Sequence, residues 1–207
     1  MRTIIYVDGF NLYYGAVKDT SYKWLNISKL CQALLPKNKI EKIKYFTALV
    51  SARPGDPGKP TRQQMYLRAL RTIPKLEIIY GHFLEHPVFM PLASSLPNNP
   101  QFVQVLKTEE KGSDVNIAAH LINDGYKELY QVAVLITNDS DLVGPIEIVR
   151  KELNLTVGIL NPHRKPAYAL KKAATFVKPI RKGVLAASQF PDKLTDGQGS
   201  FHKPPDW

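Results

Sequence analysis

Three short segments of the chain carry aspartates beside small polar residues. They are residues 6–11 with Asp8, residues 111–116 with Asp114, and residues 137–141 with Asp139 and Asp141. Carboxylate oxygens are ligands that Mg²⁺ and Mn²⁺ prefer. The five histidines are scattered and form no cluster with cysteine that would indicate zinc. The residue types therefore predict a site for a hard divalent cation.

Two of these aspartates directly follow short continuous apolar runs, residues 3–7 and 132–136. Such runs are typical of parallel strands that are covered on both faces. The other two stand near the starts of predicted helices, residues 113–123 and 142–153. Because ligands of an open parallel sheet bind at the carboxyl ends of its strands, we expect all four carboxylates to face one crevice.

The rest of the chain alternates apolar runs with helix-like stretches, which predicts an α/β fold. Further strands are expected at residues 43–50, 76–80, 102–107, 155–160 and 176–180, and further helices at 27–35, 61–72 and 167–174. The proline-rich stretch 85–101 predicts an irregular surface excursion. Residues 1–181 are expected to form one domain, followed by a polar tail, 182–207, with little core of its own.

Each aspartate segment also has a purely structural explanation that stays open. Asp8 and Gly9 suit a turn, and Asp114 and Asp139 suit helix caps. Taken together, however, the four carboxylates would raise each other's pKa values and oppose folding unless a cation relieved their repulsion. Their convergence therefore favours a metal site.

The overall charge indicates an anionic partner. Lys and Arg number 28 against 18 Asp and Glu, a formal net charge of +10 in 207 residues. Nucleic acid is the commonest such partner, with an acidic membrane surface as the runner-up. Cys31 is the single cysteine, which excludes an internal disulfide and a cysteine metal cage. No apolar run suits a signal peptide or a membrane span, so a cytoplasmic protein is expected.

An acidic site inside a basic protein suggests phosphodiester hydrolysis, in which a metal activates water and a nearby carboxylate acts as base. At this point the three segments, in their order and spacing, resemble the NYN domain, specifically its LabA-like branch, in the PIN-like nuclease superfamily. The resemblance covers roughly residues 1–180. It implies a Rossmann-like three-layer α/β/α sandwich with a central, mainly parallel sheet, and Mg²⁺- or Mn²⁺-dependent cleavage of RNA, expected to be single-stranded.

The resemblance also implies roles for individual residues. Asp8, Asp114 and Asp139 would be the main metal-site carboxylates, and Asp141 a fourth, directly or through water. Asn11 would hold Asp8 or the substrate. Hydrogen bonds from two residues of the third segment would shape the site; these are Asn138 and Ser140.

Basic and aromatic residues near these segments are candidate substrate contacts. Lys111 is the favoured phosphate contact, because it precedes the metal-site helix. A solvated surface is the alternative for it and for the other basic candidates, Arg62, Arg68, Arg71, Lys107, His163, Arg164, Lys165, Lys171 and Lys172. Phe10, Tyr13 and Tyr14 either stack on unpaired bases or pack into the core.

Other functions stay open at this stage. The same fold could serve as a catalytically weak or inactive RNA-binding or interaction module, although all expected aspartates are present. A phosphatase is disfavoured by the basic charge, and a DNA-directed nuclease is not excluded, since nothing reads the 2′-hydroxyl. The sequence leaves the oligomeric state open, a homo-oligomer included.

Overall fold

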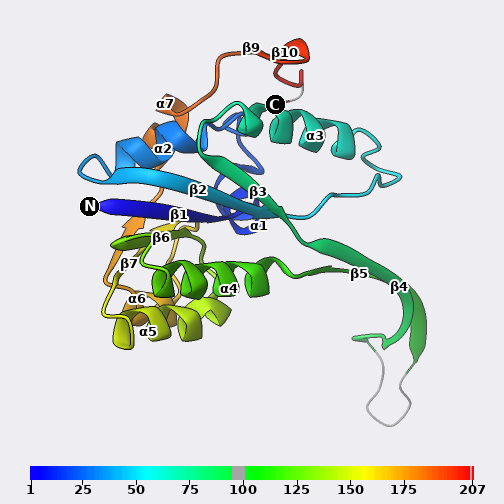
Figure 1. Ribbon diagram of the computed structural model, residues 1–207. Helices are drawn as coiled ribbons and strands as arrows, with labels where there is room; N and C mark the ends of the chain where they lie inside the picture. The colour runs from blue at the N-terminus through cyan, green and yellow to red at the C-terminus, as the bar shows by residue number, and fades with distance from the viewer. Residues whose placement is uncertain (95–100, 206) are drawn as a thin grey trace.

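A central parallel sheet of six strands organises the molecule. The computed structural model describes residues 1–94, 101–205 and 207, and Figure 1 shows the sheet between two layers of helices. The strand order is β3-β2-β1-β6-β7-β8, and every neighbouring pair is parallel. The strands are β1 (Arg2–Asp8), β2 (Lys39–Thr47), β3 (Leu76–Tyr80), β6 (Val132–Ile136), β7 (Thr156–Asn161) and β8 (Phe176–Pro179). The expected three-layer α/β fold is confirmed.

Helices cover both faces of this sheet. One face carries α1 (Gly9–Leu12), a π-helical turn (Tyr13–Val17), α2 (Ile27–Leu34), α3 (Lys59–Arg71) and α7 (Lys182–Ala187). The other carries α4 (Ser113–Tyr126), α5 (Val143–Lys151), which follows a 3₁₀ turn (Ser140–Leu142), and α6 (Tyr168–Ala173). Among the described residues, no helix is both long and apolar enough to cross a membrane.

Successive residues of β1 point to opposite faces and enter two separate cores. Ile5 and Val7 pack under α1, α2 and α3, whereas Ile4 and Tyr6 pack under α4 and α5. Because both faces are buried, the middle of the strand, residues 4–7, is apolar without alternation. The two cores together hold β1 rigidly, and Asp8 ends that strand.

The expected irregular excursion is instead a two-stranded antiparallel arm, so the prediction for residues 85–91 was wrong. β4 (His82–Pro91) pairs with β5 (Phe102–Lys111) from His82↔Lys111 to Pro91↔Phe102. In a two-stranded sheet each strand has an open side, where proline removes no ladder hydrogen bond. Residues 95–100 of that prediction lie outside the described residues. The expected edge strand at 102–107 forms, but in this separate sheet, which projects from the body in Figure 1.

The segment after residue 181 differs from the expected tail, because it adds to the domain's core. Leu185, Phe190 and Phe201 are buried in the same core as α2 and α3. They lie on α7, on the following loop and on a hairpin of β9 (Lys193–Asp196) and β10 (Gly199–His202). A few well-spaced apolar residues are enough to pack the segment against the domain. The polar average composition of residues 182–207 does not reveal them.

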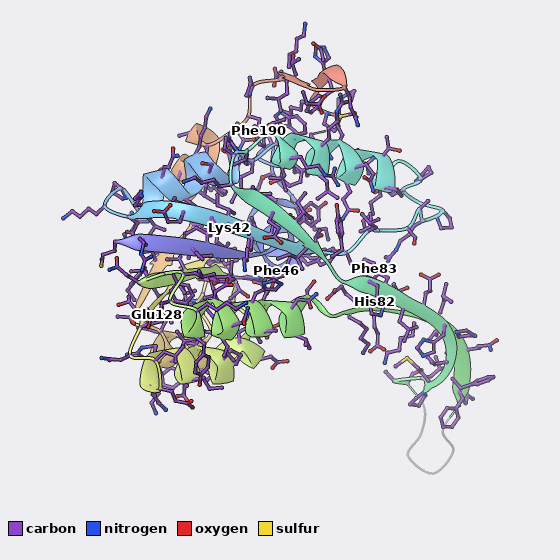
Figure 2. All side chains as sticks on the ribbon, in the orientation of Figure 1. Lys42, Phe46, His82, Phe83, Glu128 and Phe190 are labelled. Atoms are coloured by element: carbon purple, nitrogen blue, oxygen red, sulfur yellow. The ribbon has the colours of Figure 1, made fainter. Side chains whose placement is uncertain are left out.

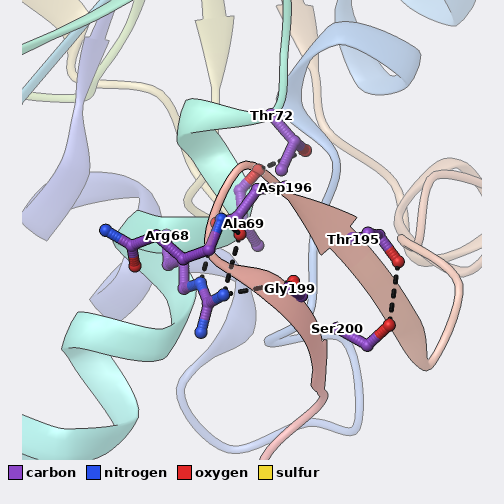
Figure 3. A network of polar contacts seen from close by, with 8 residues as sticks. Arg68, Ala69, Thr72, Thr195, Asp196, Gly199 and Ser200 are labelled. Atoms are coloured by element: carbon purple, nitrogen blue, oxygen red, sulfur yellow. Dashed lines mark hydrogen bonds and ion pairs between the residues drawn. The ribbon is translucent and has the colours of Figure 1, made fainter.

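An ion pair fastens this hairpin to α3. Arg68 donates from Nε and Nη2 to the two carboxylate oxygens of Asp196, at 2.7 and 2.8 Å, as Figure 3 shows. Its guanidinium also lies 4.2 Å from the ring centre of Phe201. Arg68, a candidate substrate contact from sequence, therefore has a structural partner.

Candidate metal centre

An acidic pocket of about 410 Å³ opens at the carboxyl ends of β1 and β6. Asp8, Asp114 and Asp139 line it, together with Asn11. The structure thus brings together three of the four aspartates that the sequence singled out. Asp141 is exposed and is not among the residues that line the pocket, although its charge helps to raise the pKa of Asp114.

Asp8 is the most deeply buried of these carboxylates, with 6% of its surface exposed. Its Oδ1 accepts a hydrogen bond from the Asn11 backbone N–H at 2.9 Å, and its Oδ2 accepts one from the Thr137 hydroxyl at 3.2 Å. Burial raises the pKa of Asp8, the charges of Asp114 and Asp139 add to the rise, and the two hydrogen bonds oppose it, so that the pKa is about 7. The carboxylate is therefore short of positive charge.

Asp139 and Asp114 bring two further carboxylates to the pocket from neighbouring elements. Asp139 follows β6 and caps the next turn, where its Oδ1 accepts from the Asp141 backbone N–H at 2.9 Å. Asp114 lies in the first turn of α4, and its pKa is raised by burial and then by the charges of Asp139 and Glu110. The helix-cap explanation thus holds for Asp139 at the same time as its place in the pocket.

Two asparagines join the loops that surround the pocket. Asn11 accepts at Oδ1 from the Asn138 backbone N–H at 2.8 Å, and the same oxygen lies 3.1 Å from Nε2 of His163. Asn138 in turn accepts from the Ala167 backbone N–H at 2.7 Å. The Asn11 side chain therefore bridges the ends of β1, β6 and β7, while only its backbone contacts Asp8. Asn138 shapes the site from outside the pocket lining.

Sequence reasoning missed several residues that line this pocket, and four of them are charged or aromatic. Glu110, at the end of β5, accepts from the Ser113 hydroxyl at 2.9 Å. Arg53 and Lys59 come from the loop before α3 and from its first residue. Phe83, at the base of the arm in Figure 2, has its ring centre 5.6 Å from that of Phe10. Only tertiary contacts bring these residues here, so no local pattern in the sequence marks them.

Several predicted substrate contacts lie elsewhere. Lys111 is outside the pocket lining and its Nζ lies 3.6 Å from a Glu109 oxygen. Ser140 is exposed and also outside the lining. Arg62 pairs with Asp56 at 2.5 Å, and Lys107 with Glu109 at 2.8 Å. Of the predicted basic contacts, His163 lines the acidic pocket.

A second, aromatic cavity of about 90 Å³ adjoins the acidic pocket. Phe10, Tyr14, Val50 and Lys59 line both spaces. Deeper in, its walls are aromatic and include Tyr13, Tyr45, Tyr66 and Trp207. Two of the aromatics flagged in the sequence, Phe10 and Tyr14, therefore stand between an acidic and an aromatic compartment.

The donor set suits Mg²⁺ or Mn²⁺ in chemistry. The three pocket aspartates offer only oxygen. Burial and then the neighbouring carboxylates raise the pKa values of Asp8 and Asp114, and a bound cation would stabilise both in the ionised form. Within the part of the chain that the structure describes, no three His, Cys, Asp or Glu side chains are grouped tightly enough to enclose an ion. Mg²⁺ usually takes one or two carboxylates and completes its shell with water and substrate phosphate, which fits this arrangement.

Comparison with known proteins identifies the family of this chain. The NYN domain family profile matches residues 2–181. The chain is 31% identical, over an alignment of 240 residues, to 6-hydroxy-3-succinoylpyridine 3-monooxygenase HspA of Pseudomonas putida (strain DSM 28022 / S16), covering all of this chain and 75% of that protein. The crystal structure of VPA0982, a protein of unknown function from Vibrio parahaemolyticus RIMD 2210633, shares the fold. Its TM-score is 0.57 at 17% identity, over 87% of this chain and 93% of that one. Because the profile match spans nearly the whole chain, the protein belongs to the NYN domain family, of PIN-like fold.

Proposed function

We propose that this protein is a metal-dependent nuclease that hydrolyses phosphodiester bonds in single-stranded RNA. The observation that carries the proposal is the acidic pocket, where Asp8, Asp114 and Asp139 converge in a chain of net charge +10. The family supports it, because NYN domains are generally nuclease domains. The resemblance to the LabA-like branch is part of the proposal.

The three aspartates would hold Mg²⁺ or Mn²⁺, with Asp141 assisting through water. Such an ion, when bound, lowers the pKa of its water and neutralises charge on a phosphate. Arg53 and Lys59 line the same pocket and would fix the phosphate without reading sequence. Asn11 and Asn138 keep the strand ends in register around it.

The test is cleavage of end-labelled single-stranded RNA, with DNA of the same sequence beside it, in Mn²⁺, Mg²⁺ or EDTA. We expect metal-dependent cleavage of RNA by the wild type, and loss of cleavage to the EDTA level in Asp8→Asn and Asp139→Asn. Asp192→Asn, at an exposed position outside the pocket, is the matched control and should cleave normally. Activity that survives both pocket substitutions would come from a contaminant and would remove the proposal.

If the wild type binds RNA without cleaving it, an RNA-binding module is the better description. Lys59→Ala and Arg53→Ala should then weaken binding and reduce its dependence on salt. Lys111→Ala should have a smaller effect, because that side chain lies outside the pocket and beside Glu109.

A second function is favoured by one relative and one observation. The relative from Pseudomonas putida is named for oxygenation of a hydroxylated pyridine, and an aromatic cavity adjoins the acidic pocket here. We propose small-molecule oxidation as the alternative activity. It is tested by mass spectrometry of 6-hydroxypyridine-3-carboxylate incubated with the protein, dioxygen and a reduced nicotinamide. No gain of oxygen over a protein-free control would discard it.

A further inference from the structure

The aromatic cavity beside the acidic pocket has the walls of a binding site for a flat ring. Phe10 and Tyr14 form the boundary between the two spaces, and Tyr45, Tyr66 and Trp207 line the interior. Aromatic side chains attract planar ligands by stacking or edge-to-face contact. Tyr14 is 54% exposed, an unusual position for an aromatic residue that serves only to fill a core.

Two hydroxyl-bearing residues that line this cavity form no side-chain hydrogen bond within the described part of the chain. Tyr45 is 6% exposed and Thr47 is 3% exposed, and both line the cavity. Within residues 1–94, 101–205 and 207, no hydrogen bond from either side chain is found. By contrast, the neighbouring Tyr66 hydroxyl donates to the Leu25 carbonyl at 2.9 Å. In the described part of the chain, the buried side-chain atoms without a partner are His86 Nδ1 and Gln189 Oε1, so the Tyr45 and Thr47 hydroxyls are open to solvent. Open hydroxyls that line a cavity suit a ligand that offers ring nitrogen or oxygen atoms.

The cavity alone is too small to enclose a ring, because its volume of about 90 Å³ is below the ~150 Å³ of an apolar cavity that holds benzene. A single ring therefore fits only across the opening, where the cavity and the acidic pocket of about 410 Å³ share their lining. A fused two-ring system would need the walls to move.

The positive charge at the opening of the cavity indicates that the ligand also carries an anionic group. Lys59 lines both spaces, and Arg53 lines the acidic pocket beside it. A phosphate or carboxylate attached to the ring would therefore lie between Lys59 and the metal-site aspartates. The ring would point away from the metal site and the anionic group toward it.

Building on the function proposed above, we propose that this cavity binds a single nitrogen-containing aromatic ring with oxygen substituents and an attached anionic group. A pyrimidine nucleotide of RNA has this chemistry, and so does a free hydroxylated pyridine acid. In the nuclease, the cavity would hold an unstacked pyrimidine base next to the phosphate to be cleaved.

Binding is measured by the intrinsic fluorescence of the whole protein in Mg²⁺. Trp24 and Trp207 are the two tryptophans, their ring centres are 6.4 Å apart, and Trp207 lines the cavity. The probes are uridine 5′-monophosphate, 6-hydroxypyridine-3-carboxylate, adenosine 5′-monophosphate and ribose 5-phosphate. We expect saturable quenching by one or both single-ring probes, with the purine nucleotide weaker and ribose 5-phosphate weaker by about tenfold or more.

Variants separate ring binding from simple anion binding. Tyr14→Ala should weaken the single-ring probes roughly tenfold, as loss of a stacking partner does. Tyr45→Phe, which removes one hydroxyl, should weaken them about fivefold. Tyr168→Ala is the matched control, because Tyr168 is 81% exposed on α6 and lies outside the cavity. Since Tyr14 is largely exposed, its substitution tests the idea even if Tyr45→Phe fails to fold.

The outcomes distinguish the two sources of the ring and the two proposals. Tighter binding of the nucleotide assigns the cavity to RNA, and tighter binding of the pyridine acid assigns it to a free metabolite. The cavity proposal is overturned if neither single-ring probe quenches, if ribose 5-phosphate binds as well as the nucleotide, or if Tyr14→Ala and Tyr45→Phe both bind like wild type. The probes contain no phosphodiester bond, so RNA cleavage without ring binding sinks this proposal alone, and ring binding without cleavage sinks the nuclease alone.

Discussion

Replacing Asp8 with asparagine should make the metal-free protein more stable at neutral pH. The Asp8 carboxyl is 6% exposed, and its pKa is raised from 3.8 to about 7, chiefly by burial. A carboxyl whose folded pKa lies above its unfolded pKa keeps its proton longer in the folded state. Stability is therefore greatest below about pH 4, falls as the pH rises toward 7, and is constant above that.

The size of the effect follows from the shift. About three pKa units at 1.36 kcal/mol each correspond to a destabilisation of about 4 kcal/mol once the carboxyl is ionised. Asparagine removes the charge, but it offers one acceptor oxygen where Asp8 accepts from both Asn11 and Thr137. Subtracting one lost hydrogen bond of about 1.5–3 kcal/mol leaves a net gain of roughly 2 kcal/mol for Asp8→Asn at pH 7.5.

The assay is urea unfolding in EDTA at intervals from pH 4.5 to 8.5. The wild-type free energy of unfolding should fall across pH 4.5–7 more steeply than that of Asp8→Asn. The exposed control Asp192→Asn should follow the wild type. Adding Mg²⁺ at pH 7.5 should stabilise the wild type and have less effect on Asp8→Asn. An Asp8→Asn protein that is less stable than wild type at pH 7.5 in EDTA would refute the burial argument.

Three further substitutions test the fold around the site. Gly158→Ala should lower the free energy of unfolding by about 1–3 kcal/mol, because the added carbon would lie 2.1 Å from the Phe176 ring. The control is Gly144→Ala, where the added carbon meets open space. Equal urea midpoints for these two variants would contradict the packing argument. Lys44→Met should lower the free energy of unfolding by about 3–5 kcal/mol, because it leaves Asp124 charged and buried; Lys44 Nζ lies 2.5 Å from Asp124 Oδ2. The double variant with Asp124→Asn should recover part of that loss in the same unfolding assay. No recovery would argue against the ion pair. Arg68→Ala should speed limited proteolysis within residues 193–203 and leave the central sheet intact. The control is Arg71→Ala, which removes a hydrogen bond to the Tyr80 hydroxyl and should not speed proteolysis of the hairpin. Equal cleavage in both variants would show that the hairpin does not depend on Arg68.

The parallel strands and the aspartates at their ends could be predicted from the sequence. A strand buried on both faces must be apolar throughout, and β1 and β6 show this directly. The polar residue that follows such an apolar run lies at the carboxyl end of the strand. This places Asp8 at the end of β1 and Asp139 shortly after β6. Asp141 was harder to place, because Asp139 caps its backbone N–H in a 3₁₀ turn and the Asp141 side chain stays exposed.

The basic and aromatic lining could not be predicted in the same way. Arg53 and Lys59 line the pocket from the loop before α3 and from its first residue, far along the chain from the three aspartates, so no local pattern indicates them. Lys111 was chosen for its nearness in sequence to Asp114, yet it ends a strand of the arm, and Gly112 turns the chain there with φ at +98°. Nearness along the chain thus misled where a single glycine redirects the backbone.

The arm of β4 and β5 begins and ends at adjacent points of the body. His82 pairs with Lys111, the chain enters from β3 through Gly81, and it leaves into α4 through Gly112. Cross-strand pairs could therefore be deleted two at a time from the outer end without widening the gap that the body must close. The entropy of loop closure depends only weakly on length. The arm is thus a module whose length can change in evolution or by design while the six-stranded sheet and its helices stay as they are.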